Sequence, residues 1–104
     1  PGLIGYIGAD RRYTLANHAY VAWHGLGLDA IVGADVAALY GVDDYPRFAP
    51  YLERALAGEP VAFEVDVTRH GRAWSMRMSY VPHIDDGGRT VGVYVMGTDL
   101  TELK

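Results

Sequence analysis

Apolar and polar residues alternate strictly in the second half of the chain. From Val61 to Thr68 every second residue is apolar, and the same alternation returns from Trp74 to Tyr80. A period of two is the signature of a β-strand that buries one face. His70-Gly71 supplies a turn between the two runs. We therefore expect a β-hairpin, with Glu64 or Asp66 opposite Arg77 on its solvent side.

A third strand is expected from Thr90 to Thr98, after the turn residues Asp85-Asp86-Gly87-Gly88. Its pattern is apolar on both faces, with Val91, Val93 and Val95 on one and Tyr94 and Met96 on the other. An exposed apolar patch usually marks an interaction surface. Tyr94 and Met96 therefore predict a homodimer interface, or cover by a flanking helix outside this sequence. The alternative is that the N-terminal residues cover them.

The first half of the chain is made of shorter segments. A buried strand from Leu3 to Ala9 and a second segment from Tyr13 to Ala16 indicate another hairpin. Asn17 is placed to cap a short helix that ends near His24. Glycines then limit the helices at Leu28–Val32 and Asp35–Tyr40 to one or two turns each.

One longer amphipathic helix is expected from Asp43 or Asp44 to Leu56, ending at Ala57-Gly58. Pro50 would disturb its interior, so its regular part can begin only near that residue. The order of elements predicts an α+β domain: a five-stranded antiparallel sheet flanked on one face by several short helices and one longer helix.

Composition narrows the function classes. A chain of 104 residues fits one domain, residues 1–104, with a self-supporting core. Its formal charge of −4 is spread along the chain, which argues against nucleic-acid binding and against membrane contact by this domain. The absence of cysteine excludes disulfides and thiolate nucleophiles and favours a cytoplasmic location. Because the chain starts at Pro1, we expect it to be part of a longer multidomain protein.

No residue cluster predicts catalysis or metal binding. The four histidines, His18, His24, His70 and His83, lack the spacing of metal ligands and are interpreted as scattered surface side chains. Ser75 lies outside any nucleophile elbow, and no paired carboxylates suited to acid–base chemistry are evident. We predict no catalytic residue and no metal site.

Three segments in this order resemble a PAS domain: Tyr6 to Asn17, Leu28 to Gly33, and Tyr80 to Val93 followed by Thr98 to Glu102. The resemblance covers essentially the whole chain. It implies a sheet that cups small helices around a cavity, and a role as a sensor or dimerisation module in a signalling protein. The linked output domain would be a histidine kinase, a nucleotide cyclase or a transcription factor.

The resemblance also suggests a signal relay. Asp99, Leu100 and Thr101 match the box that links the last strand of PAS domains to an output helix, and Glu102 follows them. Asp99 or Thr101 could cap that helix. Haem and flavin are disfavoured, because the expected longer helix has no histidine, the chain has no cysteine, and Gly97 stands where the flavin-binding subgroup carries a glutamine.

Aromatic and methionine side chains are the candidate ligand pocket. The residues proposed to line it are Tyr40, Phe48, Tyr51, Phe63, Met76, Met78 and Tyr80, with a modest cavity near Tyr40, Tyr51, Met76 and Met78. The competing interpretation is that most of them fill the core. The leading hypothesis is a sensory module for an unidentified small ligand. The alternatives are a ligand-free dimerisation or scaffold module and, more remotely, a small enzyme or carrier.

Overall fold

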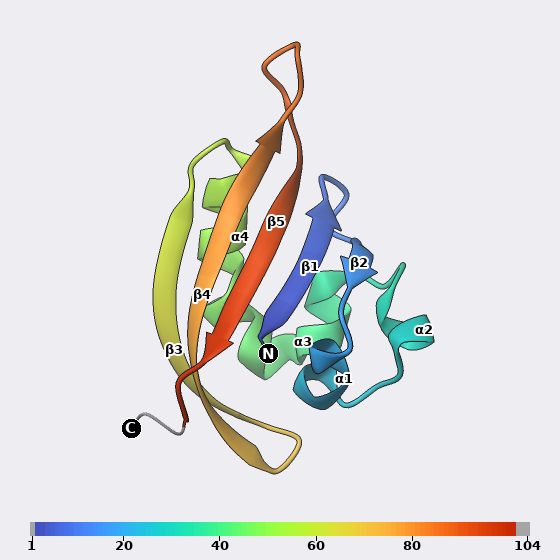
Figure 1. Cartoon of the computed structure of the whole chain (residues 1–104), viewed down its shortest axis with the longest axis vertical. Coiled ribbons are helices and arrows are strands. Elements are labelled where there is room, and N and C mark those ends of the chain that lie inside the picture. Colours follow the sequence, from blue (N-terminus) through green and yellow to red (C-terminus); the bar gives the residue numbers. More distant parts are fainter. Residues whose placement is uncertain (1, 102–104) are drawn as a thin grey trace.

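The computed structural model describes residues 2–101 and shows one antiparallel sheet with helices on one face (Figure 1). The strands lie in the order β2-β1-β5-β4-β3. Their bounds are β1 Leu3–Gly8, β2 Tyr13–Ala16, β3 Val61–Arg69, β4 Arg72–Ile84 and β5 Thr90–Asp99. The helices are α1 Ala19–His24, α2 Leu28–Ile31, α3 Val36–Asp44, the 3-10 helix η1 Tyr45–Arg47 and α4 Ala49–Leu56. The predicted fold class is confirmed.

The β3–β4 hairpin forms where the alternation predicted it. His70 and Gly71 both adopt positive φ, 51° and 78°, as the two central residues of a tight hairpin turn require. Glu64 lies directly opposite Arg77, and their charged groups are 3.5 Å apart on the exposed face. β4 continues past Pro82, which is tolerated because β3 pairs with β4 only as far as Tyr80.

The expected helix from Asp44 divides at the prolines, as anticipated. Pro46 lies in the short η1, and α4 begins at Ala49 with Pro50 in its first turn. Neither proline then removes a hydrogen bond from a helix interior. Arg11, in the β1–β2 turn, reaches across to α4, where its Nε donates to a Glu53 carboxylate oxygen at 2.7 Å.

Two local predictions were wrong. Asn17 does not cap α1: its side-chain oxygen accepts from the Ile4 N–H at 3.1 Å and its amide donates to the Gly2 carbonyl at 2.8 Å. The Asn17 side chain thus stabilises the start of β1 rather than the first turn of α1. Val91 was expected on the buried face with Val93 but is exposed, because a register shift at the end of the β4–β5 ladder leaves it without a pairing residue in β4.

The core lies between the sheet and the helices. Its largest fully buried side chains include Trp23, Tyr13, Tyr20, Phe48 and Leu52, which come from β2, α1 and the α4 region. β5 is the central strand, paired with β1 on one side and β4 on the other. Core side chains are closely packed, so a shift of those that contact β5 would also displace this strand, which ends at Asp99.

Candidate functional site

The candidate pocket residues form one continuous aromatic layer. Tyr40 and Phe48 stack with ring centroids 4.2 Å apart, and Tyr51 and Phe63 stack at 3.8 Å with their planes 6° apart. Phe48 and Phe63 meet edge to face at 6.1 Å and join the two pairs. Tyr80 contacts Phe63 at 5.4 Å. Edge-to-face pairs such as the last two stabilise a core by about 0.5–1.5 kcal/mol each beyond their burial.

Only part of this layer lies beside open space. Tyr51 and Phe63 line a groove of about 440 Å³ between the η1–α4 segment and β3, together with Pro46, Arg47, Pro50, Glu64, Val65 and Asp66. Tyr40, Phe48, Met78 and Tyr80 are buried in the core, and Met76 lines a different hollow. The structure therefore brings the predicted residues into contact but distributes them over a groove, a packed core and a second hollow.

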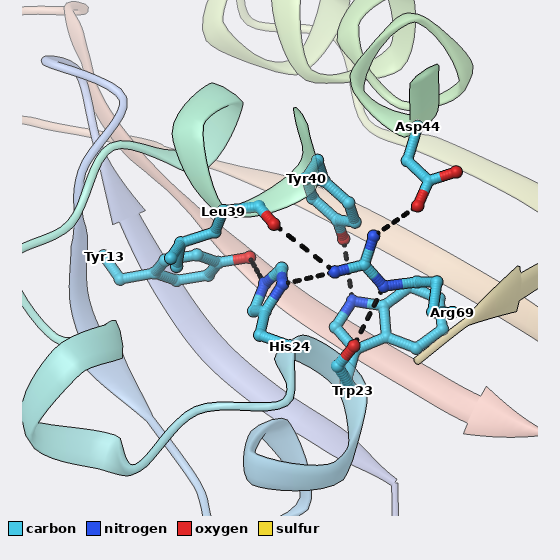
Figure 2. Close-up of polar contacts among 7 residues, drawn as sticks. All are labelled: Tyr13, Trp23, His24, Leu39, Tyr40, Asp44 and Arg69. Atoms are coloured by element: carbon cyan, nitrogen blue, oxygen red, sulfur yellow. Dashed lines mark hydrogen bonds and ion pairs between the residues drawn. The ribbon is translucent and has the colours of Figure 1, made fainter. Parts of the chain in front are cut away.

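A buried arginine network lies beside this layer (Figure 2). Arg69, at the end of β3, is 3% exposed. Its guanidinium donates to the Trp23 carbonyl at 2.9 Å, to the Asp44 carboxylate at 2.6 Å and to His24 Nδ1 at 2.8 Å. It also lies over the rings of Trp23 and Tyr40. One side chain thus joins β3 to α1 and α3.

His24 is held as a neutral imidazole in one tautomer. Because arginine only donates, Nδ1 must accept from Arg69, and Nε2 therefore carries the proton and donates to the Tyr13 hydroxyl oxygen at 2.9 Å. Burial, together with the positive charge of Arg69 and the nearby His70, lowers the pKa of His24 to about 3. The interpretation of His24 as a surface histidine was wrong: it is 1% exposed.

The sequence did contain a signal for Arg69. The inward positions of β3 are the odd-numbered residues from Val61 to Val67, and continuing that alternation points Arg69 inward. A buried arginine then requires partners. Burial also raises the pKa of Tyr40, whose hydroxyl accepts from the Trp23 indole at 2.9 Å, to about 12.

The junction after β5 is tied to β4 by polar bonds. The Asp99 carboxylate accepts from the Thr101 N–H at 2.9 Å and from the Arg72 guanidinium at 2.6 Å. The Leu100 N–H donates to the Ser75 carbonyl at 2.7 Å, and the Ser75 N–H donates to the Thr101 hydroxyl oxygen at 3.1 Å. Partial burial opposes ionisation of Asp99, but the bonds from Thr101 and Arg72 outweigh it and lower its pKa. Glu102 lies outside the described residues.

Comparisons with known proteins place this geometry in a family. The family model of the PAS fold matches residues 1–104. The chain belongs to the PAS family. The search of curated proteins found no match.

Solved structures agree with this assignment. The PAS domain of BvgS from Bordetella pertussis is 28% identical, with a TM-score of 0.80 over 97% of this chain and 78% of that one. VqmA bound to DPO is 20% identical, with a TM-score of 0.82 over 96% of this chain and 52% of that one. A sensory box sensor histidine kinase from Vibrio cholerae is 16% identical, with a TM-score of 0.74 over 97% and 82%. The last two show the fold alone.

The outer face of this PAS sheet carries an exposed apolar patch. Tyr94 and Met96 are 47% and 59% exposed, and they point outward as predicted. Across the strands, Met96 lies opposite Ile4 and Tyr94 lies opposite Val81. We define the outer-face patch as Ile4, Leu15, Val81, Tyr94 and Met96, all of which are exposed. The first described strand, Leu3–Gly8, does not cover it, because these residues form β1 within the same sheet.

Two further findings bear on the PAS domain as a whole. Within residues 2–101, no helix has the length and apolar character needed to cross a membrane. In the same described part of the chain, no three histidine, cysteine or acidic side chains come together as a metal site would require. PAS domains are sensory modules and are typically not catalytic themselves.

Proposed function

We propose that this PAS domain is a sensory and regulatory module that relays a signal through Asp99, Leu100, Thr101 and Glu102 to a covalently linked output domain. The observation that carries the proposal is the pair of bonds made by Asp99, one to Arg72 in β4 and one to Thr101 beyond the sheet. The output is a kinase, a nucleotide cyclase or a transcription factor.

The central position of β5 supports this coupling. β5 pairs with β1 and β4 over almost its whole length, so a ligand that repacks the core changes the strand ending at Asp99. A ligand shifts such an equilibrium only by its difference in affinity for the two states. The groove beside Tyr51 and Phe63 is the candidate ligand-binding site, because these two belong to the residues predicted to line the pocket.

A relay through Asp99 predicts a specific mutant phenotype. In the full-length protein, Asp99→Ala should change the output activity or its response to signal, because Thr101 loses its acceptor and Arg72 loses its partner. Loss of a cap of this type costs about 0.5–2 kcal/mol, so the domain should remain folded. Asp86→Ala, in the exposed β4–β5 turn, is the control. Wild-type output from the Asp99→Ala protein would contradict the relay.

The second candidate is a dimerisation module whose core holds no ligand. The outer-face patch favours it, because apolar side chains from β1, β2, β4 and β5 are exposed on one surface. A stable interface would bury about 800 Å² on each partner, and one sheet face is the kind of flat surface that can supply this. Dimerisation and ligand sensing are compatible in one module.

Dimerisation through this face predicts that Tyr94→Glu weakens self-association at least tenfold, because a carboxylate would be buried without a partner. Sedimentation velocity over a range of concentrations measures the change. The matched control is Val42→Glu, which places the same charge at a 90% exposed position on α3. A wild-type chain that stays monomeric, or a Tyr94→Glu variant that associates like the wild type, would exclude the dimer.

A further inference from the structure

The two edges of the sheet differ in how they are covered. The start of β2 is paired by the segment before α3: the Tyr13 N–H donates to the Ala34 carbonyl at 3.1 Å, and the Tyr13 carbonyl accepts from the Gly33 N–H at 2.7 Å. At the other edge lies β3, nine residues long, which pairs with β4 alone among the described strands (Figure 1). An open strand edge presents backbone donors and acceptors with which another chain can pair.

The backbone groups on the open side of β3 belong to its even-numbered residues. Arg69 and Arg72 close a two-residue turn, and such a closing pair exchanges both of its backbone hydrogen bonds. Because bonded and non-bonded pairs alternate along an antiparallel ladder, the odd-numbered residues of β3 bond to β4. On β4, the backbone of Ser75 bonds on the side away from β3, as this alternation requires. The N–H and C=O groups of Ala62 and Glu64 therefore point away from β4.

The groove beside Tyr51 and Phe63 runs along this open edge. Four consecutive β3 residues, Phe63 to Asp66, line it, although only Phe63 and Val65 point to the helix side of the sheet. Residues from both faces of a strand line one groove only at the edge of that strand, so the backbone of β3 forms one wall. The η1–α4 segment forms the other. A slot between a strand edge and a helix suits an extended peptide, whose alternate side chains enter the slot.

The charges beside the open edge favour one kind of peptide. The outward side chains of β3 include the acids Glu64 and Asp66 and no base. The register that pairs the whole of β3 with a second copy of itself places Glu64 opposite Asp66, and like charges directly opposite destabilise a sheet. A strand with lysine or arginine opposite Glu64 is favoured instead. The contact of Glu64 with Arg77 leaves its carboxylate accessible, because the two groups are 3.5 Å apart and both side chains are more than half exposed.

We propose that β3 binds an extended peptide in which basic and apolar residues alternate. The peptide adds a sixth strand to the sheet and exchanges main-chain bonds with Ala62 and Glu64. Its basic side chains lie on the outer face with Glu64, and its apolar side chains enter the groove against Tyr51 and Phe63. The proposal rests on the proposed function only in taking this groove as the binding site, and it names the class of partner.

Amide hydrogen exchange of the 104-residue chain, followed by NMR, provides the test. The probe is a hexapeptide of alternating lysine and valine, acetylated and amidated at its ends. At saturating peptide, exchange at the Ala62 and Glu64 N–H groups should slow at least tenfold, because these groups gain acceptors. Exchange at Asp86, in the exposed β4–β5 turn, should not change. Three lysines followed by three valines keep the charge and composition of the probe but should bind at least tenfold more weakly.

Backbone methylation of the peptide tests the strand pairing itself. The lysine residues lie opposite Ala62 and Glu64, so their N–H groups face β3, whereas the valine N–H groups face solvent. A probe methylated at its lysine backbone nitrogens should therefore not bind, and a probe methylated at its valine nitrogens should bind nearly as well as the original.

A charge reversal tests the place of binding. Glu64→Lys should weaken binding of the lysine–valine probe at least tenfold, whereas Asp86→Lys, with the same change of charge in an exposed turn, should leave it nearly unchanged. No slowing at Ala62 and Glu64, equal binding of the two methylated probes, or unchanged affinity in Glu64→Lys would each overturn the proposal.

Self-pairing of β3 is the remaining alternative. Slow exchange at Ala62 and Glu64 in the peptide-free protein, if it disappears on dilution, would show that a second copy occupies the edge and would also overturn the proposal. The Asp99→Ala experiment uses no peptide, so a failure of the relay and a failure of peptide binding are distinguished.

Discussion

Arg69→Met should destabilise the domain by about 3–5 kcal/mol, the range expected when one partner of a buried ion pair is removed. Methionine keeps most of the apolar length of the side chain but none of its donors. The Trp23 carbonyl, His24 Nδ1 and the Asp44 carboxylate each lose a hydrogen bond, and the first two are in the buried interior. Urea unfolding followed by circular dichroism measures the loss.

Two further variants test whether the loss of stability comes from the buried bonds of Arg69 or would follow from removing any arginine. Arg77→Met, in the exposed pair with Glu64 on the same hairpin, should cost no more than about 1 kcal/mol. Arg69→Lys should recover only part of the stability, because a single ammonium cannot reach acceptors on α1 and α3 with the planar geometry of a guanidinium. Equal losses for Arg69→Met and Arg77→Met would show that the buried network does not stabilise the fold.

The elements that the sequence predicted well are those whose causes are local. The β3–β4 hairpin needs only an alternating pattern and two turn residues able to adopt positive φ, and both are visible within ten residues of His70-Gly71. The bond from the Thr101 N–H to Asp99 is likewise local, because its donor and acceptor lie two residues apart. Its role in signalling is a proposal.

The features that the sequence did not reveal depend on distant partners. Asn17 is a residue type that often caps helices, and it precedes α1 in the sequence. In the fold its side chain instead bonds to the Ile4 N–H and the Gly2 carbonyl, because β1 lies next to it. Alternation along β3 points Arg69 inward, but its partners on α1 and α3 lie 25 to 46 residues away in the chain. Local pattern gives the direction of a side chain, whereas only the packed fold gives its partners.

The candidate site shows the same limit. The aromatic and methionine residues do assemble into one layer, because they occupy inward positions of strands and helices that the pattern identifies. Where that layer leaves space depends on volumes contributed by small residues such as Ala19 and Ala22, which line the hollow next to Trp74. The pattern of apolar and polar residues does not reveal where a small side chain leaves space in the packed fold.

His24 should make the stability of the domain depend on pH. Its folded pKa is about 3, whereas an unfolded histidine titrates near 6.5. Between these values the unfolded chain binds a proton that the folded domain does not, so stability falls as the pH decreases below about 6.5. The slope approaches about 1.4 kcal/mol per pH unit, and it falls to zero only well above pH 6.5, where the unfolded histidine is also neutral.

The window from pH 6.5 to 5 isolates this effect. The carboxyls whose pKa is lowered in the fold, such as Asp99 and Glu53, remain ionised there in both states, and their loss of stability comes at lower pH. Urea unfolding of His24→Gln in this window should show a flatter dependence on pH, although the variant is less stable overall. His18→Gln, at an exposed position, should keep the wild-type slope. If His24→Gln keeps the full slope, His24 is not the group that titrates on unfolding, and the neutral imidazole assigned from its bonds to Arg69 and Tyr13 is wrong.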